Sequence, residues 1–195
     1  MGQRFRSSEW ESVCLVDTPE AAAGLADATQ GYAASLTCAL VVDGRLLDAG
    51  SGEPVDLTAD LTTVCFAVPP AVLPTLAEVI APMVSDQASL VVTAQSMVPA
   101  LGVLAGAAGG RAAYGLHPLF DVTSRQLEGQ AVYVVPAPEP HANAHRWLVE
   151  LLRERGAAIK FGTAAKHDRS MGYVQGMAHQ ALLGFAAAVV ESDLD

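Results

Sequence analysis

The stretch Tyr114-Gly-Leu-His-Pro-Leu-Phe120 decides the fold that we predict, because it places a lone histidine directly after a short apolar strand and follows it with a proline. Elements of alternating type precede it, with strands predicted over 62–68, 88–94 and 112–116 and helices over 71–83 and 99–107. Repeated strand and helix units with short connections are typical of an open, mostly parallel sheet covered by helices. Such sheets bind ligands at the carboxyl ends of their strands, where we expect His117.

The alternation continues on both sides of this centre. Downstream, the sequence predicts strands over 130–135 and 157–161, an amphipathic helix over 141–155 and one long helix over 164–190. Apolar residues recur at helical spacing in the amphipathic helix, and we expect Trp147 in the core. Upstream, we predict a buried strand over 13–17, a helix over 19–28, a hairpin with Asp43-Gly44 as its turn and a loop over 50–54.

Composition limits the class of protein. With 195 residues and 51% hydrophobic content, the chain can form one domain with a substantial core. Its formal charge of −10 argues against nucleic acid and anionic membranes as partners, because both attract basic surfaces. Three widely spaced cysteines indicate neither a disulfide framework nor a zinc site, which fits a reducing cytoplasm. Cys14 and Cys65 lie in apolar runs, so we expect buried thiols.

The end of the chain carries the longest apolar run, from Met177 to Val190. It is interrupted by glutamine and glycine and is too short to span a bilayer, so we expect it to be buried against protein. The apolar surface of this helix predicts self-association through Leu182, Leu183, Phe185 and Val189.

Two groups of polar residues could carry chemistry. Ser96 follows one predicted strand and His117 follows the next, so both should lie at one edge of the sheet, where the imidazole could act as a base and the hydroxyl could orient a substrate. The alternative is a serine that caps the following helix and a histidine bonded to backbone. On the last helix, the residues that share one face by spacing are Asp168, Gly172, Gln175 and His179, with His167 off that face. One aspartate and one histidine on this face are too few ligands to predict a metal site.

These motifs resemble a known family. The segment Gly115-Leu-His-Pro-Leu-Phe120, the serine 21 residues before its histidine, and the segment from Lys166 to His179 are similar to the prephenate/arogenate (cyclohexadienyl) dehydrogenase family, above all to its enterobacterial branch. The resemblance implies a Rossmann-like, nucleotide-binding domain over 1–163 that lacks its first strand. It implies that 164–195 is the first helix of a helical domain through which homodimers form. The chain thus looks like a member shortened at both ends.

The resemblance also implies roles for single residues. His117 would take the proton of the substrate hydroxyl, and Ser96 would orient the substrate beside it. Contacts with a cyclohexadienyl carboxylate would come from Gln175, His179, Arg169 and Tyr173. Contacts with NAD or NADP would come from Gly2, Asp17, Pro69 and Gln95. For Asp17, an ordinary turn aspartate at a strand end is an equal alternative.

The implied activity is an NAD(P)-dependent oxidative decarboxylation of prephenate, arogenate or 4-amino-4-deoxyprephenate toward an aromatic product, in aromatic amino acid biosynthesis or secondary metabolism. The family's leading glycine-rich turn is absent from the sequence, and Ala178 stands where the enterobacterial branch has an arginine. Two alternatives therefore stay open. One is a redox-inactive homologue that acts as a decarboxylase, dehydratase, isomerase or binding protein for a cyclohexadienyl acid. The other is a structural partner that docks through its last helix.

Overall fold

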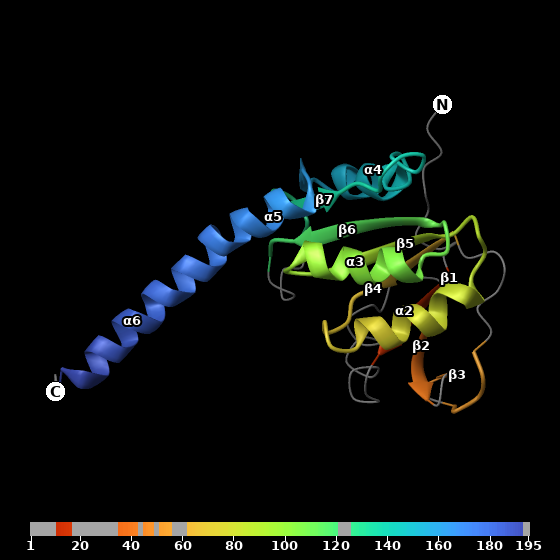
Figure 1. Cartoon of the computed structure of the whole chain (residues 1–195), viewed down its shortest axis with the longest axis horizontal. Coiled ribbons are helices and arrows are strands. Elements are labelled where there is room, and N and C mark those ends of the chain that lie inside the picture. Colours follow the sequence, from red (N-terminus) through yellow and green to blue (C-terminus); the bar gives the residue numbers. More distant parts are fainter. Residues whose placement is uncertain are drawn as a thin grey trace. The chain divides into compact units, whose positions relative to one another are not determined.

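The computed structural model describes residues 11–16, 35–42, 45–48, 51–55, 62–120 and 126–192 (Figure 1). The chain divides into two compact units. The first consists of Met1–Thr93 with Val103–Ala113, and the second of Ala94–Gly102 with Tyr114–Asp195.

A three-stranded sheet belongs to the first unit, in the order β1 (Glu11–Val16), β2 (Ser35–Val42) and β3 (Arg45–Asp48). β1 is parallel to β2, and β2 is antiparallel to β3. Val42 pairs with Arg45, so the predicted hairpin is confirmed. Its turn residues, the helix predicted over 19–28, Gly2, Asp17 and the side chain of Cys14 lie outside the described part of the structure.

A five-stranded sheet follows, with the strands in chain order β4 (Thr63–Phe66), β5 (Ser89–Thr93), β6 (Ala112–Pro118), β7 (Ala131–Val135) and β8 (Ala158–Phe161). β4 and β5 are parallel, β7 and β8 are parallel, and β6 and β7 are antiparallel. Three consecutive residues of β5, Leu90, Val91 and Val92, are buried, as expected of a strand covered on both faces. The predicted Rossmann-like, mostly parallel sheet is thereby confirmed.

Helices connect these strands. The first described one is α2 (Leu73–Ile80), which starts with a proline in its first turn and continues as the 3₁₀ segment η2 (Ala81–Met83). Its buried residues recur at helical spacing: Leu73, Leu76, Ala77 and Ile80. The others are α3 (Met97–Ala107) and α4 (Arg146–Glu154), which lead into β6 and β8.

Two predictions about burial were wrong. β4 is the first strand in the sheet order, and of its residues only Phe66 is fully buried, whereas Cys65 is exposed. Neighbouring side chains of a strand point to opposite faces of the sheet, so the thiol of Cys65 points away from the face that buries Phe66. α4 starts at Arg146, because 138–146 form successive turns in which amides bond carbonyls three residues back. Trp147 is consequently only half-buried, and Val149 is the buried residue of this helix.

The last helix has three parts: α5 (Ala164–Met171), the π-helical segment η3 (Gly172–Met177) and α6 (Ala178–Glu191). The side chain of Thr163 accepts a hydrogen bond from the amide of Lys166 and so caps its start. A π turn holds more residues than an α turn, so it breaks the spacing from which we predicted one polar face. Asp168 and Gln175 are half-buried, His179 is exposed, and His167, predicted off that face, is fully buried.

This helix forms one rod from Ala164 to Glu191 (Figure 1). Beyond Met171, every described residue except the half-buried Gln175 is exposed. The expectation that the run is too short to cross a bilayer does not hold for the whole helix, because its 28 residues, with a mean hydropathy of 1.2 over an 18-residue window, suffice by length and composition. One such helix is weak evidence for a membrane span.

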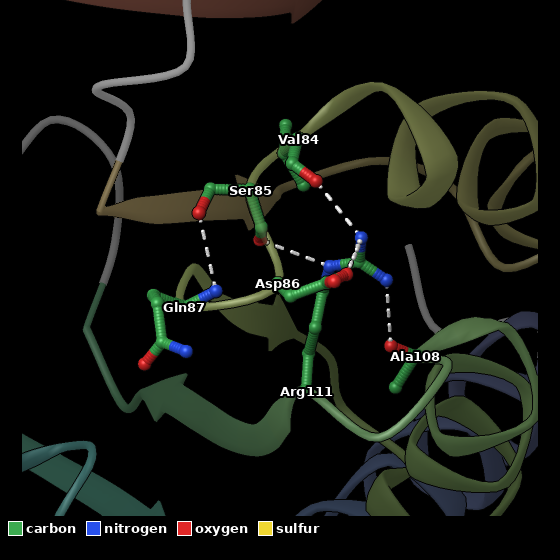
Figure 2. Close-up of polar contacts among 6 residues, drawn as sticks. All are labelled: Val84, Ser85, Asp86, Gln87, Ala108 and Arg111. Carbon is green, nitrogen blue, oxygen red and sulfur yellow. Dashed lines mark hydrogen bonds and ion pairs between the residues drawn. The ribbon is translucent and has the colours of Figure 1, made fainter.

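An arginine joins two turns within the first unit (Figure 2). The guanidinium of Arg111 donates to the carbonyl oxygens of Val84 (2.8 Å), Ser85 (3.0 Å) and Ala108 (3.1 Å), and to the carboxylate of Asp86 (2.7 Å). The side chain of Arg111 is 9% exposed, whereas that of Asp86 is 85% exposed. The carbonyl bonds should therefore contribute more to stability than the ion pair, which water screens.

We predict that Arg111→Met lowers the free energy of unfolding by about 2–3 kcal/mol, because it leaves several carbonyl groups without their donor. Asp86→Ala should cost less than about 1 kcal/mol, since it removes only the exposed partner. Denaturant unfolding of both variants measures the difference. Equal losses would mean that the ion pair is the main contribution.

A second close contact lies in the core of the second unit. Met97, Tyr133 and Val135 pack there with four partly buried residues, Ala94, Leu101, Leu119 and Ala164. The hydroxyl of Tyr133 is buried and has no hydrogen-bond partner in the described part of the chain. A Cβ atom at Gly162 would collide with this hydroxyl, so only glycine leaves room for the ring.

We predict that Gly162→Ala destabilises the protein by about 2 kcal/mol or more, because the methyl group must displace a packed ring. Tyr133→Phe should be nearly neutral, since its hydroxyl makes no hydrogen bond, and it should partly rescue Gly162→Ala. A double-mutant cycle read by thermal unfolding tests this coupling. Simple additivity of the two substitutions would contradict it.

Candidate active site

His117 lies within β6, which runs one residue further, to Pro118. The prediction of a histidine directly after the strand is therefore off by two residues at the strand end. His117 pairs with Tyr133 across the antiparallel β6–β7 ladder, and its side chain is 6% exposed. A buried imidazole needs a hydrogen-bond partner, and the partner comes from the last helix.

A chain of three side chains links β6 to α5. Nδ1 of His117 lies 2.8 Å from Nε2 of His167, and Nδ1 of His167 lies 2.7 Å from Oδ1 of Asp168. His167 is completely buried, and its ring packs edge-on against the rings of His117 and Tyr133 at centroid distances of 5.0 and 4.9 Å. The two imidazoles are thus held in a fixed orientation by apolar walls and by each other.

The carboxylate of Asp168 also binds the start of α3. Oδ1 accepts a hydrogen bond from the amide of Met97 at 2.7 Å, and Oδ2 accepts one from the amide of Val98 at 2.9 Å. These are the first two residues of the helix, whose amides have no acceptor within the helix. An anion at this end also interacts favourably with the helix dipole.

This arrangement bears on Ser96, the residue before α3. A serine in that position normally caps the second or third amide of the helix. Here Asp168 takes the second amide, and the third residue is Pro99, which has no N–H. Ser96 is exposed, and no hydrogen bond of its side chain occurs among the described residues. The capping alternative for Ser96 therefore loses support.

The electrostatics favour a neutral His117 and an ionised Asp168. Burial lowers the pKa of His117, proximity to His167 lowers it further, and the Asp168 carboxylate opposes both effects. Partial burial alone would raise the pKa of Asp168, but the hydrogen bonds from His167, Val98 and Met97 outweigh it and hold that pKa below its ordinary value. Near neutral pH, such a site contains an imidazole able to accept a proton.

The structure brings only some of the predicted residues together. The amide of Ala94 donates to the carbonyl of Leu116, so the segment that leads to Ser96 runs beside the end of β6. Gln175 is half-buried, and the exposed residues are Arg169, Tyr173, His179, Pro69 and Gln95. Within the described ranges, none of these side chains hydrogen-bonds to His117.

His167 is the residue that the sequence reasoning missed. The signal was present, because His167 and Asp168 are adjacent in the sequence, but an ideal helical spacing placed the histidine off the polar face. Both ring nitrogens of His167 and one of His117 are engaged in hydrogen bonds. This geometry suits proton transfer and orientation rather than metal ligation.

A separate pocket of about 330 Å³ lies in the second unit and does not include His117. It is lined by Asn143, His145, Arg146, Val149, Glu150, Arg153 and Phe161. Burial lowers the pKa of His145, whose Nδ1 has no hydrogen-bond partner within the described ranges. The guanidinium of Arg153 lies 5.7 Å from the centre of the Phe161 ring. We assign the chemistry to His117, because it is connected to a second imidazole and a carboxylate.

No model of a protein family matches the sequence. A curated protein of Methanocaldococcus jannaschii, named "Probable arogenate/prephenate dehydrogenase", is 26% identical over 170 residues, which are 80% of this chain and 38% of that protein. The "T-protein" of Enterobacter agglomerans is 28% identical over 81 residues, which are 42% of this chain and 21% of that protein. The chain thus spans less than half the length of the curated relatives it matches.

Solved structures agree on the fold. The prephenate dehydrogenase of A. aeolicus, in complex with hydroxyphenyl propionate and NAD⁺, superposes with a TM-score of 0.65 at 14% identity, over 97% of this chain and 72% of that one. The predicted Rossmann-like fold is confirmed by this similarity. The predicted resemblance to the prephenate and arogenate dehydrogenases is confirmed by both kinds of comparison.

Proposed function

We propose that this chain carries out the NAD(P)-dependent oxidative decarboxylation of a cyclohexadienyl carboxylate, such as prephenate or an amino analogue. The observation that supports it most is the buried His117, linked through His167 to Asp168. It provides a neutral base, which the removal of a hydroxyl proton requires. One sequence relative is named "Probable arogenate/prephenate dehydrogenase".

In the proposed reaction, His117 takes the proton of the ring hydroxyl, or of the amine in an amino analogue. The carbon that bears this group loses a hydride, and the nicotinamide would accept it when bound. The bond to the ring carboxylate then breaks, its electron pair completes the aromatic ring, and carbon dioxide leaves. The proton on His117 returns to the oxygen or nitrogen of the product.

Ser96 would orient the substrate hydroxyl beside His117. Its own hydroxyl is exposed and is not used to cap α3, whose first two amides are bound by Asp168. A hydroxyl that is both donor and acceptor can bridge a substrate oxygen and a cofactor. We also propose that the substrate is contacted by Gln175, His179, Arg169 and Tyr173. A separate proposal is that the nucleotide-binding domain ends at residue 163 and the helical domain begins at residue 164.

Pro69 and Gln95 are the described residues that we propose for nucleotide binding. Pro69 and Gln95 follow the parallel strands β4 and β5, and both are exposed, as ligand-binding loops require. They would contact NAD or NADP, together with Gly2 and Asp17. We further propose a role in aromatic amino acid biosynthesis or secondary metabolism in the cytoplasm.

His117→Asn should lower turnover of prephenate or its amino analogue by about 100-fold to 10,000-fold, because it removes the base. Binding of NAD or NADP, followed by fluorescence titration, should stay within about twofold, since His117 is not among the residues proposed to contact the cofactor. Ser96→Ala should give a smaller loss. Wild-type protein that binds neither cofactor would refute the redox reaction and favour a non-oxidative one.

The last helix supports a second part of the proposal, a homodimer formed through α6. Its large apolar side chains are exposed, with Leu182 at 65%, Leu183 at 66%, Phe185 at 71% and Val190 at 81%. A contiguous apolar surface of this kind in water indicates an interaction site. A second copy of the same helix offers a matching apolar surface.

We predict that the wild-type chain is a dimer by light scattering at micromolar concentration and that a Leu183→Glu/Phe185→Glu variant is a monomer, because it places charges in the apolar contact. Gln180→Glu, which adds charge at an already polar position of α6, should stay dimeric. A monomeric wild type, or one recovered only with membranes, would contradict this.

A further inference from the structure

We infer that Asp168 and His167 are positioning residues, which hold His117 in the tautomer protonated on Nδ1 and so leave the lone pair on Nε2 for the substrate. The consequence for catalysis rests on the proposed function, but the tautomer can be measured without substrate. The sequence alone did not predict that a residue of the last helix acts on His117.

The inference starts at the carboxylate. The oxygens of Asp168 accept hydrogen bonds from the amides of Met97 and Val98 and face Nδ1 of His167. An ionised carboxylate can only accept hydrogen bonds. The proton of this third contact must therefore reside on Nδ1 of His167.

The next step passes through His167. A neutral imidazole that is protonated on Nδ1 carries a lone pair on Nε2. Nε2 of His167 lies 2.8 Å from Nδ1 of His117, so His117 must donate in this bond and carry its proton on Nδ1. Its Nε2 is then unprotonated, which is the state that a general base needs.

The competing arrangement is a doubly protonated His167. In that case His167 would donate to Nδ1 of His117, and the proton of His117 would lie on Nε2. In either arrangement Nδ1 of His167 donates to the carboxylate of Asp168 at 2.7 Å, so that contact alone does not distinguish them. The two arrangements place the proton of His117 on different nitrogens, so experiment can separate them.

Few other charges face this pair. From α5 they are His167 and Asp168. From β7, Tyr133 contributes a hydroxyl that has no hydrogen-bond partner among the residues that the structure describes. Lys160 of β8, which pairs in register with Tyr133, is exposed, and so is Arg169 of α5. The charge on Asp168 is therefore the main anionic influence on His117.

Nitrogen-15 NMR of the full chain at neutral pH tests the tautomer, because two-bond couplings differ between the Nδ1–H and Nε2–H forms. The signals of His117, one of five histidines, are assigned by their loss in His117→Asn. We expect Nδ1–H in the wild type and in Lys166→Gln, a change of an exposed neighbour on α5. In His167→Phe, which keeps a ring but removes the acceptor, both tautomers should appear. Nε2–H in the wild type, or unchanged Nδ1–H in His167→Phe, would overturn the inference.

The pH dependence of turnover separates positioning from a merely structural role. Asp168→Asn removes the anion that opposes the lowering of the pKa of His117, so that pKa falls and the acidic limb of turnover moves to lower pH. Maximal turnover should fall by about 10-fold to 1,000-fold, because the tautomer is no longer enforced. Asparagine keeps one acceptor for the α3 amides, and thermal unfolding checks that the variant is folded. A lower maximum with an unmoved acidic limb would refute the positioning role.

The two proposals fail in different ways. Nδ1–H on His117 in a wild type that turns over no cyclohexadienyl acid would leave the positioning assignment standing and refute the function. Turnover by a wild type whose His117 carries its proton on Nε2 would refute the positioning and leave the function standing.

Discussion

The carboxylate of Asp168 is the interaction on which the site depends. It receives hydrogen bonds from two backbone amides at the start of α3 and from an imidazole of its own helix. Three donors stabilise an anion well even when it is partly withdrawn from water. One side chain thereby fixes the start of α3 and the orientation of His167, and through His167 it fixes His117.

This chain of hydrogen bonds explains why His117 of β6 can be buried. An imidazole away from water is costly unless its polar atoms are bonded, and the partner must itself be satisfied. His167 meets this need because its other nitrogen faces Asp168, while the rings of Tyr133 and His117 surround it. Glycine at 162 leaves the space that Tyr133 occupies, so a backbone position outside the hydrogen-bonded chain also contributes to its geometry.

Much of the fold could be predicted from local patterns. Apolar runs bounded by glycine and proline gave β5, β6 and β7 close to their observed bounds, and the hairpin between β2 and β3 followed from Asp43-Gly44. The exposure of Cys65 could not be predicted, because it depends on which face of β4 the rest of the fold covers. His117 and Ser96 stood out as residues near strand ends. His167 did not, since its burial depends on tertiary contacts and on a helix that departs from ideal spacing.

The π-helical segment from Gly172 to Met177 separates a part of the helix that is bonded to the rest of the fold from a part that is exposed. The turns before it are bonded into the fold through Thr163 and Asp168, whereas those after it are exposed. Loss of one residue from this segment would rotate every later side chain by about 100° around the helix axis without moving the anchored turns. A single insertion or deletion in this segment would therefore change which direction the side chains of α6 face. His167 and Asp168, which precede the segment, would keep their positions.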